Sequence, residues 1–200
     1  MQILIGTKNP HKRQKLSWVV KEYCEPVIKD DLLEVEETAH SFIETAQEKV
    51  KAYSKQFNCF AISTDAGAVI PALNKAEWEP LRTKRFGTTD QERIYKLLEM
   101  MKDKTNRTIE WHEAIAVAYN GEVLFSVLER AMDAVMDKEF NQNFYREGIW
   151  LCSISSFPQF GGKNYFELDN TQQQLTEDSW GKLRSDFNHL IQNKIPTQSI

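Results

Sequence analysis

Three residues near the amino terminus have the types and spacing of a phosphate-binding loop. Thr7, Asn9 and Lys12 follow an apolar run at residues 3–5, in an order typical of a buried strand, a polar loop and the start of a helix. Asn9 is suited to cap that helix, so the unpaired N–H groups of its first turn would point into the loop and favour an anion. Lys12 adds a positive charge in the same turn. An ordinary capped helix with a solvated lysine explains the same pattern.

An aspartate at the end of a predicted strand is the main candidate acid. Asp65 follows the apolar run at residues 59–63 and precedes two small residues, Ala66 and Gly67. A carboxylate at the carboxyl end of a strand is a common site position in α/β folds. Mg²⁺ prefers a few carboxylates together with waters and phosphate oxygens. Asp65 is therefore a candidate for metal binding or catalysis, and a plain turn at residues 64–67 is the alternative.

Three further charged residues are candidates that solvent exposure explains equally well. Glu37 precedes a long helix predicted at residues 41–57 and is a candidate second metal ligand, although it ends an acidic run at residues 34–37. Lys49 lies two turns into that helix, on a face where a charge is less expected. Arg85 ends a basic cluster in a predicted loop. Only the order of all these residues along the chain is informative.

Composition excludes several classes of function. The chain has 200 residues and a net charge of -4, which gives no reason to expect a nucleic acid polymer or an anionic membrane as partner. No apolar run approaches the roughly 20 residues of a membrane span, and no signal peptide is recognised. The three cysteines form no CxxC pair, which predicts free, mostly buried thiols in a reducing, cytoplasmic setting. The four histidines show no metal-ligand spacing.

Helix and strand signals alternate along the chain, with no repeat and no obvious linker. Helices are predicted at residues 10–23, 41–57, 90–101 and 177–192, and strands at 3–5, 26–28, 59–63, 107–119, 122–128 and 149–155. Asp90 is predicted to cap the third helix. Asn120-Gly121, between two long strand candidates, is the strongest short hairpin signal. The predicted fold class is α/β, a mixed sheet with a long central hairpin and flanking helices.

The order of these motifs resembles the inosine triphosphate pyrophosphatase family, which acts on non-standard purine nucleoside triphosphates. The family's opening Thr-x-Asn-x-x-Lys corresponds to residues 7–12, and its Glu-Thr-Gly-x-Thr-Phe-x-Glu-Asn-Ala-x-x-Lys to residues 37–49. Its Ala-Asp-Asp-Ser-Gly-Leu corresponds to residues 63–68, which keep the second Asp and the Gly. Residues 83–86 resemble the family's Ser-Ala-Arg-Tyr, and residues 162–168 resemble its Gly-Lys-Thr-Phe-Ala-Glu-Leu. The match is good over the first half of the chain and patchy beyond.

The resemblance implies a fold and an activity. The fold would be one elongated, two-lobed α/β domain over residues 1–200. The activity would be Mg²⁺-dependent hydrolysis of a nucleoside triphosphate to the monophosphate and pyrophosphate, carried out by a homodimer.

The resemblance also implies roles for single residues. Lys12 and Lys49 would bind phosphates and offset the charge that develops on the leaving pyrophosphate, while Thr7 and Asn9 shape the loop. Glu37 would help to hold the metal, and Asp65 would contact the metal or activate the attacking water. Arg85 would contribute to substrate binding.

The chain departs from the family pattern mainly where the family reads the nucleobase. The family's Gly-Phe-Gly-Tyr-Asp-Pro is matched at residues 148–153 only in its first glycine, and its Ser-His-Arg has no counterpart near residues 177–180. Thr64 stands at the first acid of the family's Asp pair. Three tryptophans are candidate stacking surfaces for a different base, with a place in the core as the alternative: Trp78, Trp150 and Trp180.

Three interpretations follow from this mixture of retained and lost motifs. The first is a Mg²⁺-dependent nucleoside triphosphate pyrophosphatase with altered base recognition. The second is a catalytically weak or inactive relative that binds a nucleotide or a protein partner. A structural protein built on the same fold is a third interpretation.

Overall fold

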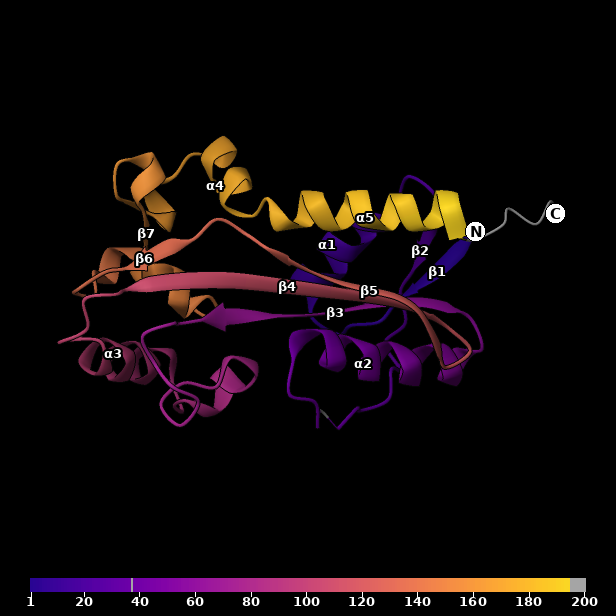
Figure 1. Cartoon of the computed structure of the whole chain (residues 1–200), viewed down its shortest axis with the longest axis horizontal. Helices are drawn as coiled ribbons and strands as arrows, with labels where there is room; N and C mark the ends of the chain where they lie inside the picture. The colour runs from indigo at the N-terminus through magenta and orange to yellow at the C-terminus, as the bar shows by residue number, and fades with distance from the viewer. Residues whose placement is uncertain (37, 195–200) are drawn as a thin grey trace. The chain divides into compact units, whose positions relative to one another are not determined.

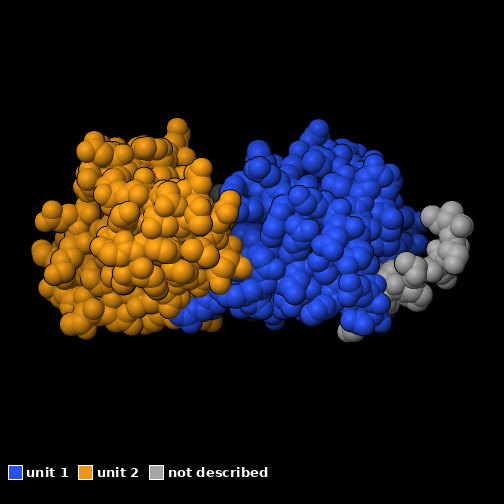
Figure 2. Space-filling view, turned by 90° about the horizontal axis from the view of Figure 1, so that it is seen from above, with its two compact units in different colours: residues 1–66, 112–130, 179–200 blue, residues 67–111, 131–178 orange. Residues whose placement is uncertain are grey.

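The computed structural model describes residues 1–36 and 38–194 of the chain (Figure 1). These residues form two compact units, coloured separately in Figure 2. Unit 1 comprises residues 1–66, 112–130 and the segment from 179 onward, and unit 2 comprises residues 67–111 and 131–178. Each unit has a hydrophobic core of its own. Within the described residues, no helix is both long and apolar enough to cross a membrane.

A mixed sheet forms the centre of unit 1. Its strands follow the order β2-β1-β3-β4, and β5 pairs with β4 beside that path. β1 is parallel to both β2 and β3, whereas β4 and β5 form an antiparallel hairpin. The strands are β1 (Gln2–Ile5), β2 (Glu25–Val27), β3 (Phe60–Val69), β4 (Thr108–Tyr119) and β5 (Glu122–Arg130).

Three helices cover this sheet. Figure 1 shows α1 (Pro10–Val20) and α5 (Ser179–Lys194) on one side of the strands and α2 (Phe42–Phe57) on the other. Apolar side chains of α1 and α5 share one core with β1, which includes the fully buried Leu16 and Phe187. The elements that carry the candidate residues of unit 1 are therefore held from both faces of one sheet.

Unit 2 is built from short elements. The first residues of β4 pair antiparallel with β6, which pairs with β7, which pairs with β8. These strands are β6 (Ala134–Met136), β7 (Ser155–Phe157) and β8 (Lys163–Asn164), and the helices are α3 (Asp90–Met100) and α4 (Asn170–Thr176). Short stretches of 3-10 helix lie at Pro80–Arg85, Gln142–Phe144, Trp150–Ile154, Pro158–Phe160 and Tyr165–Glu167.

Several predictions from local sequence chemistry are confirmed. The β4–β5 hairpin turns at Asn120 and Gly121, whose φ values of 47° and 86° are the left-handed values that this dipeptide tolerates. All three cysteines are free. Burial raises the pKa of each thiol above its usual value, that of Cys152 to about 12.

Three predictions of local structure are wrong. The strand expected at residues 149–155 is mostly a 3-10 helix, Trp150–Ile154, because its buried residues do not alternate and the Ser155 hydroxyl donates to the Leu151 carbonyl at 2.7 Å. The last helix begins at Ser179 rather than residue 177, and the separate helix α4 precedes it. Thr89, not Asp90, caps α3, because the Thr89 hydroxyl accepts the Glu92 N–H at 3.1 Å.

A close backbone approach at the end of β1 predicts a sensitive glycine. A Cβ at Gly6 would lie 2.8 Å from Tyr53 Cδ2 and 3.0 Å from the Ile62 carbonyl oxygen, so we expect Gly6→Ala to lower the free energy of unfolding by about 1–3 kcal/mol. The matched control is Gly181→Ala in α5, where a Cβ meets nothing within 4 Å and helix propensity gains up to about 1 kcal/mol. Urea unfolding curves measure both, and equal effects of the two variants would contradict this account of Gly6.

Candidate functional site

The junction between β1 and α1 forms the capped loop that the sequence predicts. The Asn9 side chain caps α1, because its Oδ1 accepts the Lys12 N–H at 3.1 Å. The Thr7 hydroxyl accepts the Asn9 N–H at 3.2 Å. Pro10 occupies the first turn, where its missing N–H costs nothing. The Thr7–Lys12 segment, called the β1–α1 loop below, therefore presents the positive end of a helix dipole.

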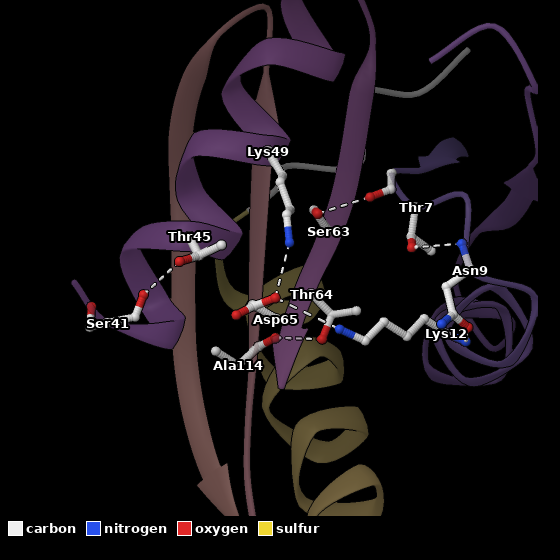
Figure 3. Close-up of polar contacts among 11 residues, drawn as sticks. Thr7, Asn9, Lys12, Ser41, Thr45, Lys49, Ser63, Thr64, Asp65 and Ala114 are labelled. Atoms are coloured by element: carbon white, nitrogen blue, oxygen red, sulfur yellow. Dashed lines mark hydrogen bonds and ion pairs between the residues drawn. The ribbon is translucent and has the colours of Figure 1, made fainter. Parts of the chain in front are cut away.

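Two lysines from different helices meet one carboxylate at β3 (Figure 3). Lys49 Nζ of α2 lies 2.9 Å from Asp65 Oδ1, and Lys12 Nζ of α1 lies 3.7 Å from the same oxygen. The side chain of Lys49 is 16% exposed, that of Lys12 24% and that of Asp65 12%. Water therefore screens these charges less than it would at an open surface. Two ammonium groups therefore share one carboxylate oxygen.

The position of Lys49 follows from the pattern of its helix. The buried residues of α2 include Phe42, Ala46, Val50 and Tyr53, which recur at helical spacing. Lys49 lies on the edge of this apolar stripe and so points towards the sheet instead of into solvent. Ser41 caps the helix by accepting the Glu44 N–H at 3.2 Å. The unexpected charge on this face is thus explained by its pairing with an acid of the sheet.

Asp65 lies in the middle of β3, because the strand continues to Val69; the predicted strand end at Asp65 and the alternative of a turn at residues 64–67 are therefore wrong. Hydrogen bonds from the two residues before Asp65 hold this part of β3 in place. The buried Ser63 hydroxyl donates to the Gly6 carbonyl at 2.9 Å, which ties β3 to the β1–α1 loop. The buried Thr64 hydroxyl donates to the Ala114 carbonyl of β4 at 2.7 Å. Thr64 therefore serves as a link between strands, and it supplies no second carboxylate beside Asp65.

Two other predicted site residues, Glu37 and Arg85, are not among the residues of this cluster that the structure describes. Glu37 lies outside the described residues. Arg85 belongs to unit 2, at the end of the Pro80–Arg85 turn, and its side chain is exposed. The roles of both residues stay predictions.

Sequence reasoning missed one arginine next to the loop. Arg13 Nε donates to the Thr7 carbonyl at 2.8 Å, and its two terminal nitrogens donate to the Lys29 carbonyl and the Asp30 carboxylate at 2.9 and 2.8 Å. Its only signal in the sequence is that it follows Lys12 in the capped turn. Its acceptors, two of them backbone carbonyls, carry no signal that the sequence reveals.

The cluster of Lys12, Lys49 and Asp65 could supply one carboxylate ligand to a magnesium ion. Among the described residues, no group of three or more His, Cys, Asp or Glu side chains is arranged to hold a metal. Mg²⁺ nevertheless requires only one or two protein carboxylates when substrate phosphates and waters complete its shell. Asp65 meets this requirement with one carboxylate, provided that its ammonium partners move to the phosphates.

Comparison with known proteins identifies the family. Residues 3–145 match the model of the Ham1 family. The chain belongs to the Ham1 family. This confirms the resemblance inferred from the motifs.

Individual relatives agree with this assignment to the Ham1 family. A dITP/XTP pyrophosphatase of Synechocystis sp. is 32% identical to this chain, over 58% of this chain and 59% of its own length. A dITP/XTP pyrophosphatase of Acholeplasma laidlawii is 31% identical, over 63% of this chain and 64% of its own length. The chain thus matches less than two thirds of either relative. A HAM1 protein from Coxiella burnetii has the same fold, with a TM-score of 0.79 and 21% identity over 94% of this chain and 99% of that one. The predicted mixed α/β fold class is confirmed.

The shared carboxylate predicts an unusual response to its neutralisation. In a metal-free buffer containing a chelator, we expect Asp65→Asn to strengthen binding of inorganic pyrophosphate about five-fold, because the lysines lose a resident competitor worth about one ion pair. Isothermal titration calorimetry measures the affinity. The control Glu22→Gln makes the same change in net charge beside Arg184 of α5 and should leave the affinity unchanged. Weaker binding by Asp65→Asn would refute this view of the cluster.

Proposed function

We propose that this chain is a nucleoside triphosphate pyrophosphatase that releases the monophosphate and pyrophosphate with the help of Mg²⁺. The observation that carries the proposal is the convergence of Lys12, Lys49 and Asp65 beside the amino terminus of α1. Helix N–H groups and two ammonium groups are the donors that a polyphosphate tail requires. Membership of the Ham1 family and the names of the relatives point to the same reaction class.

The proposed reaction depends on positioning and charge. The phosphate tail takes over the ammonium groups of Lys49 and Lys12, which then offset the charge that develops on the leaving pyrophosphate. The freed Asp65 carboxylate would hold the cation or accept a proton from the attacking water, and its negative charge is required in either role. Mg²⁺, when bound, would supply charge neutralisation on the phosphate oxygens. Thr7 and Asn9 hold the loop in shape. Water adds across the bond between the α- and β-phosphates.

We further propose non-standard purine nucleoside triphosphates as the substrate class, with altered base recognition. The relatives named dITP/XTP pyrophosphatases motivate the class. The altered recognition rests on unit 2, where Ile149, 48% exposed, follows the one glycine kept from the family's aromatic motif.

The tryptophans give no support to base stacking. Trp78 and Trp150 lie in the core of unit 2 and Trp180 in that of unit 1, each at most 8% exposed. The core alternative therefore explains all three.

The roles implied by resemblance for residues elsewhere remain proposals. We propose Glu37 as a second metal ligand and Arg85 as a substrate-binding residue, and we propose a homodimer in the cytoplasm. Analytical ultracentrifugation of the protein measures the oligomeric state.

A specific observation favours a second candidate function. Thr64 replaces an acid that the resemblance places beside the proposed base, and its hydroxyl is committed to the Ala114 carbonyl. A relative that binds nucleotide without turnover would have such a site. Calorimetric binding of a triphosphate without hydrolysis is the result that this alternative predicts.

The leading proposal predicts activity that depends on one lysine and not on its neighbour. We expect Mg²⁺-dependent pyrophosphate release from a panel of standard and deaminated triphosphates, and we expect Lys49→Met to lower kcat/KM about 10²- to 10³-fold, the scale for loss of one donor to developing charge. The matched control is Lys51→Met on the same helix, whose side chain is exposed. A coupled phosphate assay with inorganic pyrophosphatase measures the rate.

Two results would overturn this proposal. One is the absence of turnover for every triphosphate by pure, folded protein. The other is equal activity of the Lys49→Met and Lys51→Met variants.

A further inference from the structure

Arg13 connects the β1–α1 loop to a segment that is distant in sequence. Its guanidinium donates through Nε to the Thr7 carbonyl and through both terminal nitrogens to Lys29 and Asp30. The rigid fork of an arginine suits such simultaneous contacts, which a lysine cannot reproduce. Lys8 adds a second connection, because its Nζ lies 2.5 Å from Glu34 Oε1.

The segment at residues 29–34, called the post-β2 segment below, is itself anchored. Leu32 is only 3% exposed. The Leu33 N–H donates to Gln56 Oε1 at 3.1 Å, and Gln56 Nε2 donates back to the Asp31 carbonyl at 2.8 Å. Because Gln56 belongs to α2, the segment is held against the helix that carries Lys49. Arg13 thus ties the loop that carries Lys12 to a fixed part of unit 1.

The contacts of Arg13 separate it from two simpler explanations. A direct phosphate ligand presents its fork to the phosphate, but Arg13 directs three of its five N–H donors, one on each guanidinium nitrogen, to protein acceptors. A surface ion pair would depend on Asp30, whose side chain is 92% exposed, and such pairs contribute little. The two backbone carbonyls are therefore the contacts that matter, and they define the position of the loop.

We propose that Arg13 is a positioning residue that holds the β1–α1 loop where its N–H groups and Lys12 can meet the phosphate tail. This inference rests on the proposed function. Arg13 acts through Thr7 and touches no reacting atom. A misplacement of about 1 Å in such a loop is enough to reduce catalysis about 10²-fold.

The test compares Arg13→Met and Arg13→Lys with the control Arg184→Met. Arg184 is a partly exposed arginine of the same unit that pairs with Glu22 at 3.1 Å and lies over the Trp18 ring. We expect Arg13→Met to weaken pyrophosphate binding, and to lower kcat/KM for the triphosphate, by a similar factor of about 10 to 100. Inhibition by the nucleoside monophosphate should stay unchanged, which a general loss of structure would not produce. Arg13→Lys should be intermediate and Arg184→Met should match wild type.

The outcomes distinguish this inference from the function on which it rests. Wild-type protein that binds neither pyrophosphate nor a triphosphate overturns both. Wild-type protein that binds pyrophosphate, with Arg13→Met binding it equally well, overturns the role of Arg13 alone. Should Arg13→Met fail to fold, Arg13→Lys decides, and an affinity equal to that of wild type overturns the role.

Discussion

One carboxylate shared by two ammonium groups is the interaction on which the rest of the site depends. Asp65 draws Lys12 from α1 and Lys49 from α2 to a single oxygen. Burying these charges carries a desolvation cost that their mutual attraction must offset. The sheet makes the arrangement possible, because β3 carries the acid between helices on its two faces and is held by the hydroxyls of its neighbours. The result is a pair of ammonium groups held close together in a chain whose net charge is -4.

The same interaction accounts for how the site meets a polyanion. A phosphate tail competes with Asp65 for the lysines, so binding exchanges an internal ion pair for contacts with substrate and leaves the carboxylate facing it. Thr64 donates its hydroxyl to the Ala114 carbonyl, so the position before Asp65 supplies a link between strands and not a second carboxylate. In the proposed function, Asp65 and Glu37 would hold the cation, and phosphate oxygens and waters would complete its shell.

Much of the phosphate end is predictable from the sequence because its signals are local. Asn9 and Pro10 predict a helix start within a few residues. Lys49 is recognisable as a charged residue beside the apolar stripe of its own helix. Their meeting at Asp65 followed from the family resemblance rather than from any local pattern. Arg13 escaped prediction because its acceptors include backbone carbonyls six and sixteen residues away.

Unit 2 was harder to predict for a related reason. Its elements are short, and a single 3-10 turn such as Trp150–Ile154 has no period that an apolar run reveals. Tertiary packing decides their conformation. The residues that replace the family's base-reading motifs fall in or next to this region, which is why the phosphate end is understood in more detail than the base end.

The most direct measurement is a crystal structure of the protein with Mg²⁺ and a triphosphate analogue whose α–β bridging oxygen is replaced by an imido group. The account predicts that the phosphate oxygens accept hydrogen bonds from Lys12 and Lys49 beside the β1–α1 loop, and that Asp65 is released from its 2.9 Å contact with Lys49. An analogue bound elsewhere, with both lysines still on Asp65, would contradict it.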